Sequence, residues 1–242
     1  TTKLPWKDLN IDVIVESTGL VTAYEKAKFH IDQGARKVVI SAPSKGDGTV
    51  PGEMILLGVN EEKFGTCDIT SNASCTTNAS SPLIGILDEA IGIEKALLNT
   101  THAYTGTQAL VDGPSKKDLR EGRAAAQNIV PSSTGAAIAV GKVYPKLDGL
   151  FDGISIRVPV PAGSIVDITF IAKRSTTAEE VNAILTKAAS EDRWKGVFAV
   201  TNVPLVSSDI LGESHASLAD LAMTRVVGGN LVKVLAWYDN EM

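Results

Sequence analysis

Cysteine is scarce in this sequence. Only Cys67 and Cys75 occur among its 242 residues, so a disulfide framework of the kind that holds small secreted domains together is not expected. A reducing, cytoplasmic setting fits this composition best. The two cysteines and three scattered histidines also lack the spacing typical of metal ligands. We therefore expect no metal site.

Long apolar runs and an excess of positive charge are also missing. No apolar stretch reaches the roughly 18 residues that a membrane span requires. The net charge is −5, whereas binding to nucleic acid or to an anionic membrane surface requires a basic face. Residues 1–5 lack the apolar core of a signal peptide. The sequence thus predicts neither a membrane protein nor a nucleic-acid-binding protein.

The glycine-rich motif G-x-G-x-x-G, which binds the pyrophosphate of dinucleotides, is absent as well. Residues 11–41 nevertheless predict a strand, a helix ended by Gly34 and a second strand. Such a unit pairs its strands in parallel. If it is half of a dinucleotide-binding fold, the pyrophosphate loop lies upstream of Thr1. The missing initiator Met and the uncapped stop at Met242 also lead us to expect a piece of a longer protein.

Polar residues follow both predicted strands of this unit. Ligands of parallel sheets bind at the carboxyl ends of the strands, where this sequence has Ser17-Thr18-Gly19 and Ser41-Ala42-Pro43. Residues 44–60 are rich in glycine and proline and predict a loop. Taken alone, the unit indicates a partial, Rossmann-like α/β sheet and no particular ligand.

The pattern changes at about residue 75. Apolar residues recur at helical spacing over residues 83–91, behind the polar stretch 71–74, which can cap a helix. Pro82 lies inside this span, so the helix either bends there or has an irregular first turn.

Strands dominate the rest of the chain. Residues 153–158, with Ile154, Ile156 and Val158 on one face, and residues 166–172 alternate in the manner of strands. A capping box at residues 177–180 starts another helix, and the glycines within 225–233 predict a hairpin. We therefore predict two domains, residues 1–74 and 75–242, the second of the α+β class with a mixed or antiparallel sheet flanked by helices.

Cys75 is the candidate nucleophile. It lies among small polar residues at the start of the predicted helix, where the helix dipole and unpaired N–H groups favour a thiolate. Cys67 has neither a helix start nor an obvious base nearby, and we expect it to be structural.

Three histidines could act as the base. His30 lies in the middle of a helix among charged residues and is expected to face solvent, while His215 lies in a loop-like segment that suggests a structural role. His102 falls at the end of a predicted strand, where catalytic groups are often presented, so a catalytic and a structural role fit it equally well.

Two features suit an anion. Residues 131–137 supply hydroxyls and backbone N–H groups in a glycine-containing turn, a setting that binds phosphate. Arg157 ends an apolar strand and needs an anionic partner, which could be a phosphate or a nearby carboxylate.

Several segments together resemble the phosphorylating glyceraldehyde-3-phosphate dehydrogenases. The most specific is Ser71-Asn72-Ala73-Ser74-Cys75-Thr76-Thr77-Asn78, which resembles the family's active-site segment. The others follow in family order over the whole chain: residues 15–19, 39–43, 131–137, 157–159 and 237–241. The resemblance implies that residues 1–74 are the C-terminal part of an NAD-binding domain and residues 75–242 a catalytic domain, without the first part of the coenzyme domain and the C-terminal helix.

The resemblance also implies a mechanism. The Cys75 thiolate adds to glyceraldehyde 3-phosphate, His102 takes the hydroxyl proton as hydride leaves for NAD, and inorganic phosphate attacks the resulting thioester to give 1,3-bisphosphoglycerate. A glycolytic or gluconeogenic oxidoreductase is therefore expected. The family's long interface loop corresponds to residues 104–127, which implies a homotetramer.

The remaining site residues are carried over from the resemblance alone. The C3 phosphate of the substrate is expected at Thr105 and Arg157, and the attacking phosphate at Ser74, Thr76, Thr134 and Gly135. The coenzyme is expected to contact Ser17, Thr18, Gly19, Ser41 and Asn240, with NAD preferred over NADP.

Three other interpretations stay open. Erythrose-4-phosphate dehydrogenases share the thiol mechanism on a longer sugar phosphate. A second possibility is a structural or binding fragment that holds no coenzyme, because the glycine-rich loop is absent. A cysteine hydrolase or transferase would need no nicotinamide, but no hydrolase motif supports it.

Overall fold

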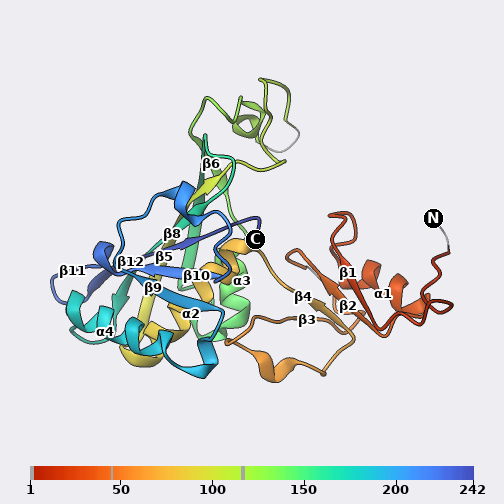
Figure 1. Cartoon of the computed structure of the whole chain (residues 1–242), viewed down its shortest axis with the longest axis horizontal. Coiled ribbons are helices and arrows are strands. Elements are labelled where there is room, and N and C mark those ends of the chain that lie inside the picture. The colour runs from red at the N-terminus through yellow and green to blue at the C-terminus, as the bar shows by residue number, and fades with distance from the viewer. Residues whose placement is uncertain (1–2, 45, 116–117) are drawn as a thin grey trace. The chain divides into compact units, whose positions relative to one another are not determined.

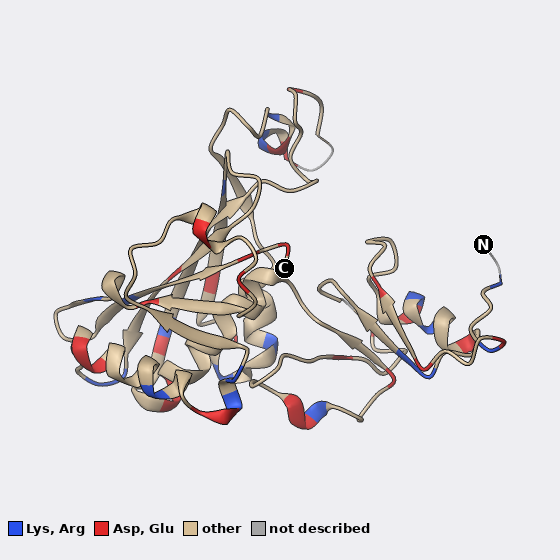
Figure 2. Cartoon of the chain, in the orientation of Figure 1, with Lys and Arg blue, Asp and Glu red and all other residues tan. Residues whose placement is uncertain are grey.

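The computed structural model describes residues 3–44, 46–115 and 118–242 (Figure 1). The chain divides into two compact units, residues 1–74 and 75–242. Acidic and basic residues are interspersed along the elements of both units (Figure 2). Within the described parts of the chain, no helix combines the length and the apolar character that crossing a membrane would need.

The first unit is a four-stranded parallel sheet with the strand order β1-β2-β4-β3. Its elements are β1 (Val13–Glu16), α1 (Tyr24–Asp32), β2 (Lys37–Ile40), β3 (Glu53–Met54) and β4 (Ile69–Ser71). The predicted strand–helix–strand unit with parallel pairing is confirmed, and Gly34 ends its helix with a φ of +106°. The predicted loop over residues 44–60 is wrong in one detail, because the short strand β3 lies within it.

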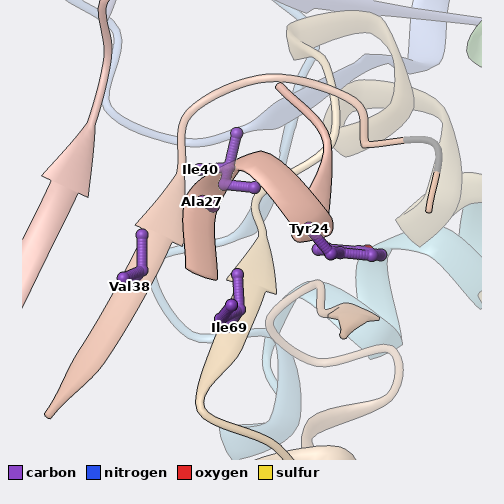
Figure 3. Close-up of a cluster of buried hydrophobic side chains, with 5 residues drawn as sticks. All are labelled: Tyr24, Ala27, Val38, Ile40 and Ile69. Carbon is purple, nitrogen blue, oxygen red and sulfur yellow. The ribbon is translucent and has the colours of Figure 1, made fainter. Parts of the chain in front are cut away.

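Apolar side chains of α1 cover the centre of this sheet. Tyr24 and Ala27 of α1 belong to one buried cluster with Val38, Ile40 and Ile69 of the strands (Figure 3). The periodicity of the helix and the alternation of the strands bring these residues to one interface. This cluster is the core that fixes α1 on the sheet.

His30 is buried, which corrects the expectation that it faces solvent. The indole Nε1 of Trp6 donates to Nδ1 of His30 at 3.1 Å, and Nε2 of His30 lies 2.9 Å from Oε2 of Glu16. Glu16 in turn accepts hydrogen bonds from the backbone N–H and the hydroxyl of Thr18. Because the indole can only donate, Nδ1 has no proton and Nε2 donates to Glu16. These four residues therefore form one hydrogen-bonded chain across α1 and the end of β1.

The second unit is an eight-stranded mixed sheet with the order β6-β7-β5-β8-β12-β10-β9, and β11 pairs with β12. β5 and β7 are parallel, as are β9 and β10, and the other pairs are antiparallel. The strands are β5 (Ile93–Ala103), β6 (Val130–Ser133), β7 (Phe151–Val158), β8 (Ser164–Ala172), β9 (Phe198–Thr201), β10 (Ser217–Asp220), β11 (Arg225–Val227) and β12 (Leu231–Tyr238). The predicted α/β plus α+β fold class is confirmed.

Three helices pack on this sheet: α2 (Cys75–Ala90), α3 (Ala136–Val143) and α4 (Ala178–Ala189). α2 runs unbroken through Pro82. One half of the predicted capping box of α4 is present, because the Thr177 hydroxyl accepts a hydrogen bond from the N–H of Glu180. The Glu180 carboxylate accepts instead from Arg174 and from the hydroxyl of Thr176. The predicted hairpin between β11 and β12 is also present, with Gly228 and Gly229 at φ values of +60° and +81°.

Successive residues of β5 and β7 point to opposite faces of the sheet. On β5, Leu98 is 1% exposed whereas Leu97 is 65% exposed. On β7, Ser155 is buried opposite Thr100, while Ile154 is 53% exposed. The face of β7 that carries Ile154, Ile156 and Val158 is therefore the face that the helices leave uncovered. The alternate positions of β7, including Arg157, share the covered face with His102 of β5.

Candidate active site

Cys75 is the first residue of α2. Ala73, two residues before it, has a φ of +58°, an uncommon conformation for a residue other than glycine. Its backbone N–H donates to the hydroxyl of Ser71 at 3.1 Å. This turn leads the chain from β4 into the helix that begins at the thiol.

His102 is the second-last residue of β5 and faces Cys75. Its Nε2 is 3.5 Å from Sγ of Cys75, and the ring is 3% exposed. Tyr238 of β12 packs edge-on against the ring, with 5.9 Å between the ring centroids. Three histidines were candidates for the base, and His102 is the one that lies beside the thiol in the structure. His215 instead bonds to Glu213, and the thiol of Cys67 donates to the carbonyl of Ile69.

Arg157 lies beside His102 because the two residues are paired neighbours on β7 and β5. Its Nη1 is 2.6 Å from Nδ1 of His102 and 3.2 Å from the carbonyl oxygen of Ala103. Within the described residues, its Nε is buried without a hydrogen-bond partner and no carboxylate forms an ion pair with it. The sequence allowed either a phosphate or a carboxylate as the partner of Arg157, and no carboxylate partner is found among the described residues.

Burial disfavours charge on both the thiol and the imidazole. Burial raises the pKa of the Cys75 thiol, although hydrogen bonds from Thr76 and the charge of Arg157 oppose the rise. Burial, and after it the charge of Arg157, lowers the pKa of His102 to about 4. Burial thus acts toward the neutral form of both the thiol and the imidazole. The sequence predicts a thiolate from the helix start, whereas burial of the sulfur acts in the opposite direction.

Tyr238 ties three elements of the site together, and sequence reasoning assigned it no role. Its hydroxyl lies 2.9 Å from the hydroxyl of Thr76 on α2 and 2.8 Å from that of Thr100 on β5. The side chain is 1% exposed. The available signal was its place on β12, where alternate residues up to Tyr238 are buried.

The residues expected to bind phosphate lie in turns or within two residues of the end of a helix or strand. Thr105 follows β5 and forms hydrogen bonds with Thr107 and Gln108, so these bonds stay within its own turn. Thr134 and Gly135 lie between β6 and α3, and the hydroxyl of Thr134 accepts a hydrogen bond from the N–H of Ala136. Thr76 is buried next to Cys75, and Ser74 directly precedes the thiol in the chain.

The residues expected to contact a coenzyme are divided between the two units. In the first unit, exposed Ser17, Thr18 and Gly19 follow β1, and exposed Ser41 follows β2. The last residues of these two strands, Glu16 and Ile40, are paired, so both polar turns lie at one edge of the sheet.

In the second unit, the side-chain oxygen of Asn240 accepts hydrogen bonds from the N–H of Gly163 at 3.1 Å and from the hydroxyl of Ser164 at 2.9 Å. The same hydroxyl accepts a bond from the N–H of Ala103. Asn240 is therefore linked to the end of β5 where His102 lies.

No group of three or more histidine, cysteine or acidic side chains with the arrangement of a metal site occurs among the residues that the structure describes. Both cysteines are free. The chemical groups gathered at this site are therefore a thiol, an imidazole, a guanidinium and a set of hydroxyls.

Comparison with known proteins gives consistent matches. Residues 74–240 match the family model described as the C-terminal domain of glyceraldehyde 3-phosphate dehydrogenase. The chain is 51% identical over 239 residues to the glyceraldehyde-3-phosphate dehydrogenase of Mycobacterium avium, covering 98% of this chain and 68% of that protein. It is 50% identical over 240 residues to glyceraldehyde-3-phosphate dehydrogenase 2 of Saccharomyces cerevisiae, covering 98% and 70%. It is 47% identical over 239 residues to glyceraldehyde-3-phosphate dehydrogenase B of Aspergillus oryzae, covering 99% and 70%.

Proposed function

Since this chain belongs to the glyceraldehyde-3-phosphate dehydrogenase family, we propose that it carries the catalytic site for the NAD-dependent oxidation and phosphorylation of glyceraldehyde 3-phosphate. The observation that carries the proposal is the 3.5 Å contact between Sγ of Cys75 and Nε2 of His102. Beside it lies the cation Arg157, which has no carboxylate partner among the described residues. A nucleophile, a base and an anion-binding group are the parts that this reaction requires.

Cys75 begins the reaction. Its sulfur adds to the aldehyde carbon of the substrate and forms a thiohemiacetal. Nε2 of His102 then takes the proton of the thiohemiacetal hydroxyl while the carbon loses hydride, which leaves a thioester on Cys75. An oxygen of inorganic phosphate attacks the thioester carbonyl, and the departing sulfur releases 1,3-bisphosphoglycerate. His102 gives the proton it took to the departing sulfur, and the proton that the attacking phosphate loses goes to solvent, so Cys75 and His102 return to the states in which they began.

Phosphate groups are expected on two sides of the thiol. We assign the C3 phosphate of the substrate to Arg157 and Thr105, because Arg157 is a partly buried cation with no acidic partner among the described residues. We assign the attacking phosphate to Ser74, Thr76, Thr134 and Gly135. The N-terminus of α3, which follows Thr134 and Gly135, offers backbone N–H groups for that purpose.

NAD supplies the hydride acceptor when it is bound. The residues of the chain fit part of this coenzyme: the polar turns after β1 and β2 lie at one edge of a parallel sheet, where such folds bind nucleotides. Ser17, Thr18, Gly19 and Ser41 would contact it there, and the Asn240 amide would orient the nicotinamide. NAD rather than NADP is our assignment.

The enzyme is expected to be a cytoplasmic homotetramer. The two free cysteines fit a reducing compartment. The segment that corresponds to the family's interface loop, together with the residues that follow it, exposes large apolar side chains, with Val111 and Leu119 each about 80% exposed. Sedimentation equilibrium of the purified chain measures the assembly directly.

Acylation of Cys75 by 1,3-bisphosphoglycerate tests the chemistry without a coenzyme, because it is the reverse of the last step. Intact-mass measurement should show one 3-phosphoglyceroyl group, mapped to Cys75 and removed by added inorganic phosphate. The Cys67→Ser variant should behave like the unaltered chain, and the Cys75→Ser variant should stay unmodified. Acylation of Cys67, or of neither cysteine, would contradict the proposal.

Two further measurements separate the remaining alternatives. Turnover of glyceraldehyde 3-phosphate and of erythrose 4-phosphate, each with and without inorganic phosphate, distinguishes the two dehydrogenase classes. Full-rate oxidation without phosphate would remove the phosphorylating step. Calorimetric titration with NAD decides whether this chain alone binds the coenzyme; we expect weak or no binding, because the sequence has no G-x-G-x-x-G motif.

A further inference from the structure

Glu16 lies between the two polar turns that follow β1 and β2. Its carboxylate accepts hydrogen bonds from the backbone N–H and the hydroxyl of Thr18. Its backbone carbonyl accepts a third from the N–H of Ser41 at 3.0 Å. The residue is only 5% exposed. One buried residue therefore holds the turn after β1 with its side chain and the start of the turn after β2 with its backbone.

The bonds of Glu16 decide which way Thr18 points. The Thr18 hydroxyl donates its single proton to Glu16 and accepts from the N–H of Leu20 at 3.2 Å. Between Thr18 and Leu20, Gly19 has a φ of +74°, which a residue with a side chain rarely adopts. The hydroxyl of Thr18 is thus used inside the turn. A ligand at this edge of the sheet would meet the backbone of the turn and the exposed side chain of Ser17.

His30 completes the set of donors around the Glu16 carboxylate. Its Nε2 donates to Oε2 at 2.9 Å, while both bonds from Thr18 go to Oε1. Burial raises the pKa of Glu16, but the hydrogen bonds from Thr18 and His30 outweigh it and hold the pKa below its ordinary value. An ionised carboxylate can accept from all three donors at once, whereas a protonated one would itself bring a hydrogen into this set.

Trp6 fixes the tautomer of His30. Its indole N–H donates to Nδ1 at 3.1 Å, so the proton of the neutral ring is on Nε2. The segment that carries Trp6 is itself held against the end of α1. The N–H of Lys7 donates to the carbonyl of Gln33 at 3.1 Å, and a Cβ at Gly34 would lie 2.8 Å from the backbone of Lys7. The indole is therefore a fixed donor at the far end of the hydrogen-bonded chain.

We propose that Glu16 and His30 are positioning residues for NAD binding, which act through the turn of Thr18 and do not touch the coenzyme themselves. The indole keeps the His30 proton directed at Glu16, and the carboxylate in turn keeps the turn in the shape that receives NAD. This inference rests on the proposed function, because it takes NAD as the ligand of the turn. It adds two buried residues, and a required tautomer, on which coenzyme affinity depends.

Glu16→Gln in the complete enzyme tests the proposal. In either orientation of the glutamine amide, its NH₂ group meets an N–H of His30 or of Thr18 and cannot accept from it. Calorimetry should show NAD binding roughly 10–100-fold weaker, the size expected for one lost hydrogen bond to a charged group. The KM for NAD should rise by a similar factor, while kcat at saturating NAD should change less than about twofold.

Removing the indole separates a positioning role from a general loss of stability. In the double variant Trp6→Phe with Glu16→Gln, the ring of His30 can carry its proton on Nδ1 and accept from the glutamine NH₂ through Nε2. NAD affinity should then recover at least about threefold relative to Glu16→Gln alone, because the two substitutions act on one chain of bonds. A merely structural role predicts the opposite, since each substitution removes a buried contact.

Nitrogen NMR of the chain labelled with ¹⁵N-histidine reads the tautomer without any coenzyme. The sequence has three histidines, and comparison with the His30→Asn variant assigns the signals of His30. The proton of the neutral ring should be on Nε2 in the unaltered chain and on Nδ1 in the double variant. A proton on Nδ1 in the unaltered chain would overturn the proposal.

Two substitutions of Thr18 test the turn itself, and they keep the proposal falsifiable if Glu16→Gln does not fold. Thr18→Ser keeps the hydroxyl that donates to Glu16, whereas Thr18→Val has a similar shape without it. Thr18→Ser should bind NAD roughly tenfold more tightly than Thr18→Val. Asp32→Asn is the matched control on α1, because Asp32 is exposed and pairs with Lys28. It should bind NAD as the unaltered enzyme does.

Three results would overturn the positioning role: unchanged NAD affinity in Glu16→Gln, equal affinities of the two Thr18 variants, or a double variant that binds no better than Glu16→Gln. The acylation of Cys75 by 1,3-bisphosphoglycerate is measured independently, because it needs no coenzyme. Acylation together with any of these three results removes the positioning role and leaves the proposed function intact, whereas absent acylation of the unaltered enzyme removes the proposed function itself.

Discussion

At the scale of single residues, the site joins a sulfur and an imidazole that both resist ionisation. Burial acts on each in the direction of the neutral form. Groups that bind nearby and change the local charge are therefore expected to alter the ionisation of both side chains. This makes the pH dependence of each group a direct measure of how the site works.

Alkylation of Cys75 by iodoacetamide should depend on pH with a midpoint above the value of about 8.5 for an unperturbed cysteine. The reason is that only the thiolate reacts and burial raises the pKa of this thiol. The rate is followed by mass spectrometry in the Cys67→Ser variant, so that one thiol is measured. A midpoint below that of free cysteine would show that the helix start, and not burial, decides the state of the sulfur.

Replacing His102 with Asn should slow the oxidation of glyceraldehyde 3-phosphate roughly 10²–10⁴-fold, which is the usual contribution of a general base. Single-turnover measurement with the complete enzyme separates this step from product release. Titration of the Cys75 thiol in the same variant controls for a damaged site. An unchanged rate would remove His102 from proton transfer.

At the scale of elements, the hydrogen-bonded chain of Trp6, His30, Glu16 and Thr18 connects α1 to the end of β1. Burial raises the pKa of Glu16, but hydrogen bonds from Thr18 and His30 outweigh it and hold the pKa below the ordinary value of 4.5. A depressed carboxyl pKa stabilises the folded state above the unfolded value and loses this effect as the pH falls through the folded value. The contribution of Glu16 is therefore present at neutral pH and lost in acid.

His30→Phe should lower the free energy of unfolding of the first unit by about 1–3 kcal/mol, because it leaves the buried Glu16 carboxylate and the Trp6 N–H without their partner. Denaturant unfolding followed by Trp6 fluorescence reports on this unit. Asp32→Asn, on the same helix but exposed and paired with Lys28, should change the stability by less than about 0.5 kcal/mol. Equal effects of the two variants would contradict the role of His30.

The sequence was most informative where one physical rule decides the structure. Periodicity, capping and glycine placement predicted α1, α4 and the hairpin of β11 and β12. It was less informative for His30, because charged neighbours along a helix do not reveal which groups pack above it. The open face of β7 was also hidden, because alternation shows that Ile154 and Ile156 share a face but not which face the helices cover.

At the active site, too, the sequence predicted local features but not the contacts between distant residues. The polar residues around Cys75 indicated a nucleophile at a helix start, and the end of β5 made His102 a candidate. Their 3.5 Å contact depends on α2 packing against the sheet, and the neighbouring Arg157 depends on the register of β5 with β7. Such pairings join residues far apart in the chain, and local patterns do not contain them.

At the scale of the whole molecule, Tyr238 connects elements separated by most of the second unit. Its hydroxyl joins Thr76, 162 residues earlier, to Thr100. Tyr238→Phe should lower the free energy of unfolding by about 1 kcal/mol, the usual net worth of a hydrogen bond.

A double-mutant cycle of Tyr238→Phe with Thr100→Val measures whether the two hydroxyls act on each other. Denaturant unfolding of the four proteins should give a coupling energy of about 0.5 kcal/mol or more, since the groups are in direct contact. Strictly additive effects would show that the Tyr238 hydroxyl is held by other partners.

The position of β12 in the sheet has a consequence during protein synthesis. A ribosome releases Cys75 and His102 long before residue 238, yet β12 lies between β8 and β10 and supplies the hydroxyl that bridges the helix and the strand of the site. A nascent chain that lacks β12 has the thiol without its finished surroundings. The two hydroxyl contacts of Tyr238 can therefore form only after the last strand has been synthesised.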